Sequence, residues 1–284
     1  MSKVKAVIHG AVSIVNAIAT GKGATLGISL QVEAVIEATA GTGIYYENKE
    51  SSLSARLIRS VIEKAVPKND LQNSKITISL KSEIPSGYGL KSSSAISSIV
   101  SLACAKLFKP QINDLEVLRH GVEASIESRV SVTGAFDDAC ACYFGGFVVT
   151  DNYNQKIVKS EKASEDLSAV IFIPRSRKRG NIRKLKVLDG VFAQAWTLAS
   201  NSDYWNAMLL NGLATSTILH SDPRILANAV EAGALAASVS GNGPSVAAIA
   251  KKENVSSVRR AFSSLNGTTI VSPINNQKAE VYEV

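Results

Sequence analysis

The stretch PSGYGLKSSSA, residues 85–95, determines how the rest of the sequence is interpreted. It follows residues 76–80, whose alternating apolar side chains predict a strand that ends by Pro85. Residues 92–108 come next, and their serine-rich start and apolar continuation predict a helix. The sequence therefore predicts a glycine-containing loop between a strand and a helix.

Such a loop is suited to binding an anion. Gly87 and Gly89 let backbone amides approach a ligand closely, and the first turn of a helix carries unpaired amides and partial positive charge. Lys91 adds a cation, and the serine hydroxyls can reach a phosphate oxygen or Mg²⁺. A serine-capped helix after a glycine loop explains the spacing equally well. A phosphate site would use Pro85, Ser86, Gly87, Tyr88, Gly89, Leu90, Lys91, Ser92, Ser93, Ser94 and Ala95.

The P-loop of many ATP-binding proteins is absent. That motif needs G-x-x-x-x-G-K followed by Ser or Thr. Its nearest imitation is Gly21-Lys22, but Gly23 follows, and Asn16 stands where the first glycine should be. If the chain binds ATP, it does so in another architecture.

Composition sets the broad class. The 284 residues are 45% hydrophobic and 19% charged, which is typical of a globular chain with one large domain or two small ones. The net charge of +7 suits an anionic substrate or a polyanion. Three cysteines argue against a disulfide framework, and the three histidines show no zinc-like spacing. No apolar run is long enough to cross a membrane, so we expect no membrane partner.

The N-terminal segment has one feature of a secretory signal. Lys3 and Lys5 precede an apolar stretch, and Ala17–Ala19 is similar to a signal-peptidase site. His9 and other polar or glycine positions interrupt the stretch, and this pattern favours a buried strand and turn. We therefore expect a cytoplasmic protein.

The remaining chain alternates between strand and helix patterns, which predicts an α+β fold with two lobes. Residues 4–39 predict short strands with glycine turns, and residues 147–158 predict a hairpin. A buried strand is expected at residues 168–174, and two or three helices within 186–230. Helices are also expected over 52–66, 113–129 and 254–265, and strands on both sides of residues 240–244 and near the C-terminus. The lobes are expected to meet near residue 155, giving domains 1–155 and 156–284.

Residues 85–95 resemble the second motif of the GHMP kinases, P-x-x-x-G-L-G-S-S-A-A. Lys91 departs from it, because most members have glycine there; a lysine followed by three serines is similar to the archaeal-type shikimate kinase branch. Residues 9–30 also resemble the opening of that branch, and SVSGNGPS at 238–245 loosely matches the third family motif.

This resemblance implies a two-lobed GHMP kinase fold, with a ribosomal-protein-like N-terminal β-α lobe and a ferredoxin-like C-terminal lobe. It implies that ATP and Mg²⁺ are used to phosphorylate the 3-hydroxyl of shikimate, giving shikimate 3-phosphate and ADP on the route to chorismate and aromatic amino acids. A homoserine or mevalonate kinase is the alternative within the family. An RNA-binding protein is the alternative from another class, because the N-terminal lobe resembles one of ribosomal proteins and the chain is basic. We expect no nucleic-acid partner, because the carboxylate pair Glu127 and Asp138 suits Mg²⁺ and phosphoryl transfer.

The resemblance also implies roles for these carboxylates. Glu127 would hold Mg²⁺ together with Ser93 or Ser94, and Asp138 would lie near the transferred phosphate as the catalytic carboxylate. Asp137 is its close competitor. Glu127 could instead be a surface charge on a helix face, and the two aspartates could cap a helix.

The basic segment at residues 175–184 is a candidate acceptor site. The planar guanidinium of arginine suits a carboxylate such as that of shikimate. The candidate residues are Arg175, Arg177 and Arg179. A solvated charge run and a nucleic-acid patch are the other readings of this segment.

Overall fold

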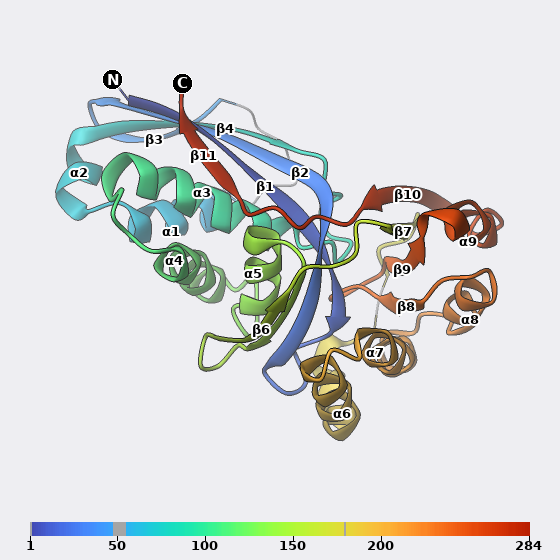
Figure 1. The fold of residues 1–284 in the computed structure, drawn as a ribbon. Coiled ribbons are helices and arrows are strands. Elements are labelled where there is room, and N and C mark those ends of the chain that lie inside the picture. The colour runs from blue at the N-terminus through green and yellow to red at the C-terminus, as the bar shows by residue number, and fades with distance from the viewer. Residues whose placement is uncertain (1, 48–54, 179) are drawn as a thin grey trace.

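The computed structural model describes residues 2–47, 55–178 and 180–284, and it confirms an α+β fold (Figure 1). Most strands lie in a larger sheet with the order β11-β1-β2-β4-β3, and β5 and β6 continue it from the first half of β2. The strands of this sheet are β1 Ser2–Val15, β2 Lys22–Ala40, β3 Gly43–Tyr46, β4 Ser74–Ser82, β5 Phe147–Asp151, β6 Lys156–Glu161 and β11 Glu280–Glu283.

The two N-terminal strands differ from the sequence prediction. Short strands with glycine turns were expected, but β1 and β2 are 14 and 19 residues long. The register of the pair shifts between His9 and Gly10 and again between Ser13 and Val15. Such bulges bend a strand and increase its twist without ending it. The prediction was wrong because glycine inside a strand gives the same local signal as glycine in a turn.

Helices cover one face of the larger sheet (Figure 1). They are α1 Ala55–Ala65, α2 Lys68–Asn73, α3 Ser92–Phe108, α4 Asp114–Glu127 and α5 Phe136–Phe144. Helix α3 is buried over most of its length, since its serines and alanines let neighbouring elements approach closely. Helix α4, at a place where the sequence predicts a helix, begins with a capping box between Asn113 and Glu116.

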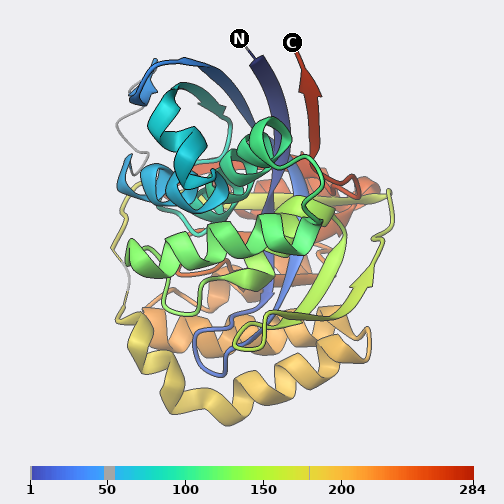
Figure 2. The same cartoon turned by 90° about the vertical axis from the view of Figure 1, so that its left-hand side faces the viewer.

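A second sheet of four strands has the order β10-β7-β9-β8. Its strands are β7 Leu167–Pro174, β8 Ala236–Val239, β9 Val246–Lys251 and β10 Gly267–Pro273. The helices of this region are η1 Ile182–Leu188, α6 Asp189–Ser200, α7 Tyr204–Leu219, α8 Arg224–Glu231, η2 Lys252–Asn254 and α9 Val255–Ala261. The chain passes from the first sheet to the second between β6 and β7. Strand β11 then returns to pair with β1, so both ends of the chain lie side by side (Figure 2). The domain division after residue 155 stays a prediction.

Buried contacts join the two sheet regions. Phe147 of β5 stacks on Tyr204 of α7, with ring centroids 3.8 Å apart. Asn211 of α7 is fully buried; its Oδ1 accepts the backbone N–H of Asn16 at 2.8 Å, and its Nδ2 donates to Ser238 Oγ at 2.8 Å. One side chain thus links the end of β1 to β8. Within the described residues, no helix is long and apolar enough to cross a membrane.

This link gives a stability prediction. Asn211→Leu keeps a similar side-chain size but leaves the Asn16 N–H and the Ser238 hydroxyl without their partner, so we expect a loss of about 2–4 kcal/mol. Urea unfolding followed by circular dichroism measures it. Asn206→Leu, at an exposed position on the same helix, is the control and should change stability by less than about 0.5 kcal/mol. Equal losses in both variants would contradict the assigned role of Asn211.

Candidate active site

The loop at residues 85–91 has the backbone expected of an anion-binding turn. Gly87 and Gly89 both adopt φ of +82°, a region that favours glycine. Helix α3 starts at Ser92 without a side-chain cap hydrogen bond at its N-cap, Lys91. The amides of its first turn are therefore not capped by that side chain, and they carry the partial positive charge that attracts phosphate. Leu90 and Ala95 are buried in the core and so anchor the loop.

Lys91 is the unusual residue of this loop. Its φ of 66° lies in the left-handed region, which costs a residue with a side chain about 1–2 kcal/mol. Its side chain is only 3% exposed, and its Nζ lies 2.9 Å from Asp138 Oδ1 and donates to Ser13 Oγ at 2.6 Å. The strained backbone thus places a buried ammonium group against a carboxylate.

The two adjacent aspartates occupy different environments. Both lie in the first turn of α5, after its N-cap Ala135, so neither caps this helix. Asp138 keeps 17% of its side chain exposed and pairs with Lys91, whereas Asp137 is 3% exposed as a residue. Asp138 is therefore the aspartate that faces the loop and solvent; its role as the catalytic carboxylate stays a prediction.

Asp137 lies in a buried polar pocket. Asn152 Nδ2 donates to its Oδ1 at 2.7 Å, and Thr25 Oγ1 lies 3.3 Å from its Oδ2. A Cβ on Gly23 would come within 2.3 Å of that same Oδ2, so only glycine leaves room for the carboxyl group. Burial, followed by the negative charge of Asp138, raises the pKa of Asp137 to about 7. Asp137 is therefore easily protonated.

The third motif packs directly on the second. Ser240 Oγ donates to the carbonyl of Gly89 at 2.9 Å, and Ser245 Oγ donates to that of Tyr88 at 2.6 Å. The backbone N–H of Gly241 donates to Ser13 Oγ at 3.0 Å. Residues 238–245, a weak signal in the sequence alone, thus form one wall of the same site.

Glu127 lies at the end of α4 and makes contacts with α1. Its carboxylate accepts from Lys64 Nζ at 2.6 Å and from Ser60 Oγ at 3.1 Å, and its side chain is 60% exposed. The hydrogen bond from Lys64, then that from Ser60, lowers the pKa of Glu127. Ser93 is exposed and Ser94 is buried at the start of α3. In the described part of the chain, no three His, Cys, Asp or Glu residues gather as a metal cluster. A metal role for Glu127 stays a prediction.

The basic segment reaches the loop through one of its arginines. The Arg177 guanidinium carbon lies 5.0 Å from the centroid of the Tyr88 ring. Arg175 is exposed, and its backbone N–H donates to the carbonyl of Asn266 at 3.2 Å. Arg179 lies outside the described residues. An acceptor role for the three arginines stays a prediction.

Sequence reasoning missed several residues that build the site. They are Ser13 on β1, Gly23 and Thr25 on β2, Asn152 after β5 and Ser240 between β8 and β9. Ser13, Gly23 and Thr25 lie within residues 9–30 and Ser240 within residues 238–245, two stretches that resemble the family, but the resemblance gave none of these side chains a role. Partners so far apart in the chain are found only once the strands are paired.

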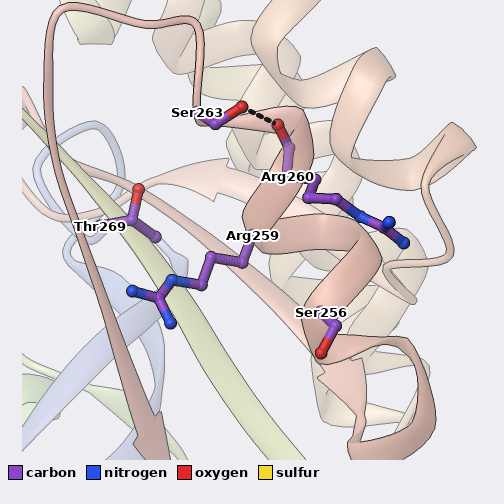
Figure 3. A pocket seen from close by; sticks show the side chains of 5 residues that line it. All are labelled: Ser256, Arg259, Arg260, Ser263 and Thr269. Atoms are coloured by element: carbon purple, nitrogen blue, oxygen red, sulfur yellow. Dashed lines mark hydrogen bonds between the residues drawn. The ribbon is translucent and has the colours of Figure 1, made fainter.

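A hollow of about 530 Å³ lies elsewhere, on α9 and β10 (Figure 3). Its lining residues are Ser256, Arg259, Arg260, Ser263 and Thr269. The two arginine side chains extend to opposite sides of the helix (Figure 3). The hollow contains no residue of the Lys91–Asp138 site.

Comparison with known proteins identifies the family. Residues 56–146 match the GHMP kinases N terminal domain, and residues 205–267 match the GHMP kinases C terminal domain. The shikimate kinase of Methanobrevibacter smithii is 34% identical over 277 residues, covering 94% of this chain and 95% of that protein. The chain belongs to the GHMP kinase family of small-molecule kinases.

Within this family, a further relative carries the same name. The shikimate kinase of Methanosarcina mazei is 38% identical over 279 residues, covering 95% of this chain and 94% of that protein. The crystal structure of homoserine kinase from Cytophaga hutchinsonii superposes with a TM-score of 0.76 at 17% identity, covering 99% and 98% of the two chains. That structural likeness confirms the GHMP kinase fold.

The contact between the two motifs gives a second prediction. A Cβ on Gly89 would lie 2.0 Å from the carbonyl oxygen of Ser240 at a φ of +82°, so the loop must move in Gly89→Ala. We expect a stability loss of about 1–3 kcal/mol and an ATP dissociation constant raised about tenfold or more. Calorimetry measures both. Gly190→Ala, whose Cβ would meet nothing within 4 Å, is the control; an equal effect there would refute the steric argument.

Proposed function

We propose that the protein is an ATP-dependent shikimate kinase, transferring the γ-phosphoryl group of ATP to the 3-hydroxyl of shikimate. The archaeal relatives named shikimate kinase support the acceptor. One structural observation carries the chemistry: the buried Lys91–Asp138 pair lies directly beside the start of α3, a helix that begins without a side-chain cap.

The phosphates of ATP fit the loop chemically. Backbone amides of residues 87–92 and the N-terminus of α3 provide donors and partial positive charge. Ser93, exposed in the first turn, adds a hydroxyl. Phosphoryl transfer needs alignment and charge stabilisation more than covalent chemistry, and these groups supply both.

Mg²⁺ would be held by oxygen ligands, which it prefers. The residues proposed are Ser93 or Ser94 with Glu127. Glu127 is well exposed and its low pKa keeps it ionised, so its carboxylate is available to a cation if it exchanges or shares its contact with Lys64. When bound, the ion would neutralise phosphate charge.

Asp138 would act on the acceptor. Lys91 and Thr25 both lie against its Oδ1, which leaves Oδ2 to accept the proton of the attacking hydroxyl. General-base help of this kind contributes typically about 10²–10⁴-fold in rate. The arginines of segment 175–179 would bind the carboxylate of the acceptor. The guanidinium group of Arg177 lies over the ring of Tyr88, in the loop at residues 85–91.

The proposal is tested by ADP release with ATP and Mg²⁺ against shikimate, homoserine, mevalonate, galactose and buffer alone. We expect turnover with shikimate alone, and a loss of about 100-fold or more in Asp138→Asn, because the amide cannot take the proton. Turnover with another acceptor would refute shikimate as the substrate but would leave the assignment as a kinase intact. If the folded protein shows no turnover with any acceptor and binds RNA in a salt-sensitive manner, the assignment as a kinase is refuted.

The metal role has its own test. Glu123 and Glu127 both pair with Lys64, at 3.5 and 2.6 Å, but only Glu127 is proposed to hold Mg²⁺. Glu127→Gln should raise the Mg²⁺ concentration for half-maximal activity about tenfold, since a neutral amide is a weaker ligand. Glu123→Gln is the matched control and should change it less than about twofold. If both variants show the same Mg²⁺ dependence, Glu127 has only the role of a surface ion-pair partner of Lys64.

A further inference from the structure

Thr25 lies between the two aspartates and has one proton to give. Its Oγ1 is 3.3 Å from Asp137 Oδ2 and 3.3 Å from Asp138 Oδ1, and it is fully buried. A hydroxyl donates a single hydrogen bond but can also accept. If both carboxylates were ionised, one of them would face an oxygen lone pair.

The amide of Asn152 settles which oxygen of Asp137 is an acceptor. Asn152 Oδ1 accepts the backbone N–H of Asp137 at 3.1 Å and the Thr150 hydroxyl at 2.6 Å. Its Nδ2 must therefore be the group that donates to Asp137 Oδ1 at 2.7 Å. A proton on Asp137 thus belongs on Oδ2, the oxygen next to Thr25.

The positive charge of Lys91 is paired with Asp138 and not with Asp137. Lys91 pairs with Asp138 at 2.9 Å, and among the ion pairs of the described residues none involves Asp137. A buried charge without a partner is costly, and a carboxyl group avoids that cost by keeping its proton. Asp138 is therefore the ionised member of the two.

We infer that Asp137 is a protonated positioning residue, which donates from Oδ2 to Thr25 Oγ1 while Thr25 donates to Oδ1 of ionised Asp138. Each hydrogen-bond donor in the series Asp137–Thr25–Asp138, called the relay below, then has an acceptor. The relay fixes the Asp138 carboxylate beside Lys91 and turns its Oδ2 toward the hydroxyl of the substrate. This role rests on the proposed function, in which Asp138 takes the acceptor proton as the new O–P bond forms and the bond to ADP breaks.

The groups that act on Asp137 are few. Burial, then the charge of Asp138 on the same helix, favours its protonation; the charge of Lys91 from the loop and the hydrogen bond from Asn152 oppose it. The neighbouring thiols of Cys140 and Cys142 have pKa values raised well above normal, by burial first, and stay neutral. As pH rises through about 7, Asp137 loses its proton, Thr25 loses the hydrogen bond that it accepts, and a second negative charge lies beside Asp138. We therefore expect kcat to fall across that range in the wild-type protein.

Kinetics of matched variants test the inference. Asp137→Asn keeps a donor toward Thr25, so kcat should fall less than about tenfold, against about 100-fold for Asp138→Asn, and the step near pH 7 should vanish. Thr25→Val should lower kcat by more than about tenfold with little change in the KM for ATP, and Thr25→Ser should recover most of that loss. Thr215→Val is the control, because Thr215 is equally buried but bonds within its own helix.

A spectroscopic measurement is independent of turnover. Infrared difference spectra of ¹³C-aspartate-labelled protein at pH 6 should show a protonated carboxyl band in the wild type and none in Asp137→Asn. Absence of that band from folded wild-type protein, or equal kcat losses in Asp137→Asn and Asp138→Asn, would overturn the inference. If no acceptor is phosphorylated, the proposed function fails, while the infrared band still decides the protonation of Asp137.

Discussion

The buried ion pair between Lys91 and Asp138 is the contact on which the rest of the site depends. It ties the loop before α3 to the first turn of α5, and Ser13 extends it to β1. Removing either partner would leave an uncompensated buried charge, a loss of about 3–5 kcal/mol. The contact is kept although the left-handed backbone of Lys91 costs about 1–2 kcal/mol.

Close packing around the pair explains why glycine and serine are so frequent here. Gly23 makes room for Asp137, and Gly89 makes room for the carbonyl of Ser240. Ser13 and Ser240 then bond the backbone and side chains that meet at this point. Small residues let five chain segments approach one another, and the serine hydroxyls pair the polar groups that such an approach buries.

The two aspartates illustrate how neighbouring groups of one type acquire different chemistry. Asp138 has a cation and some solvent, which suits an ionised base. Asp137 is buried beside that negative charge, which favours a neutral acid against the opposing hydrogen bond from Asn152. Pairs of titratable groups whose environments separate their pKa values commonly divide the acid and base roles in an active site. Their order in the chain gives no hint of this division, because the cation comes from another segment.

The sequence by itself determined the α+β class, the helix α4, the buried β7 and the loop at residues 85–91, since these depend on local periodicity and glycine. Through the family resemblance it also favoured Asp138 over Asp137 as the catalytic carboxylate, a role that stays a prediction. Only the tertiary structure decided that β1 and β2 are long bulged strands, and that Thr25 and Asn152 serve the aspartates. Thr25 lies 112 residues from Asp137 in the chain. Local patterns fix what a residue can do, but a contact at that separation exists only after β2 and α5 have packed together.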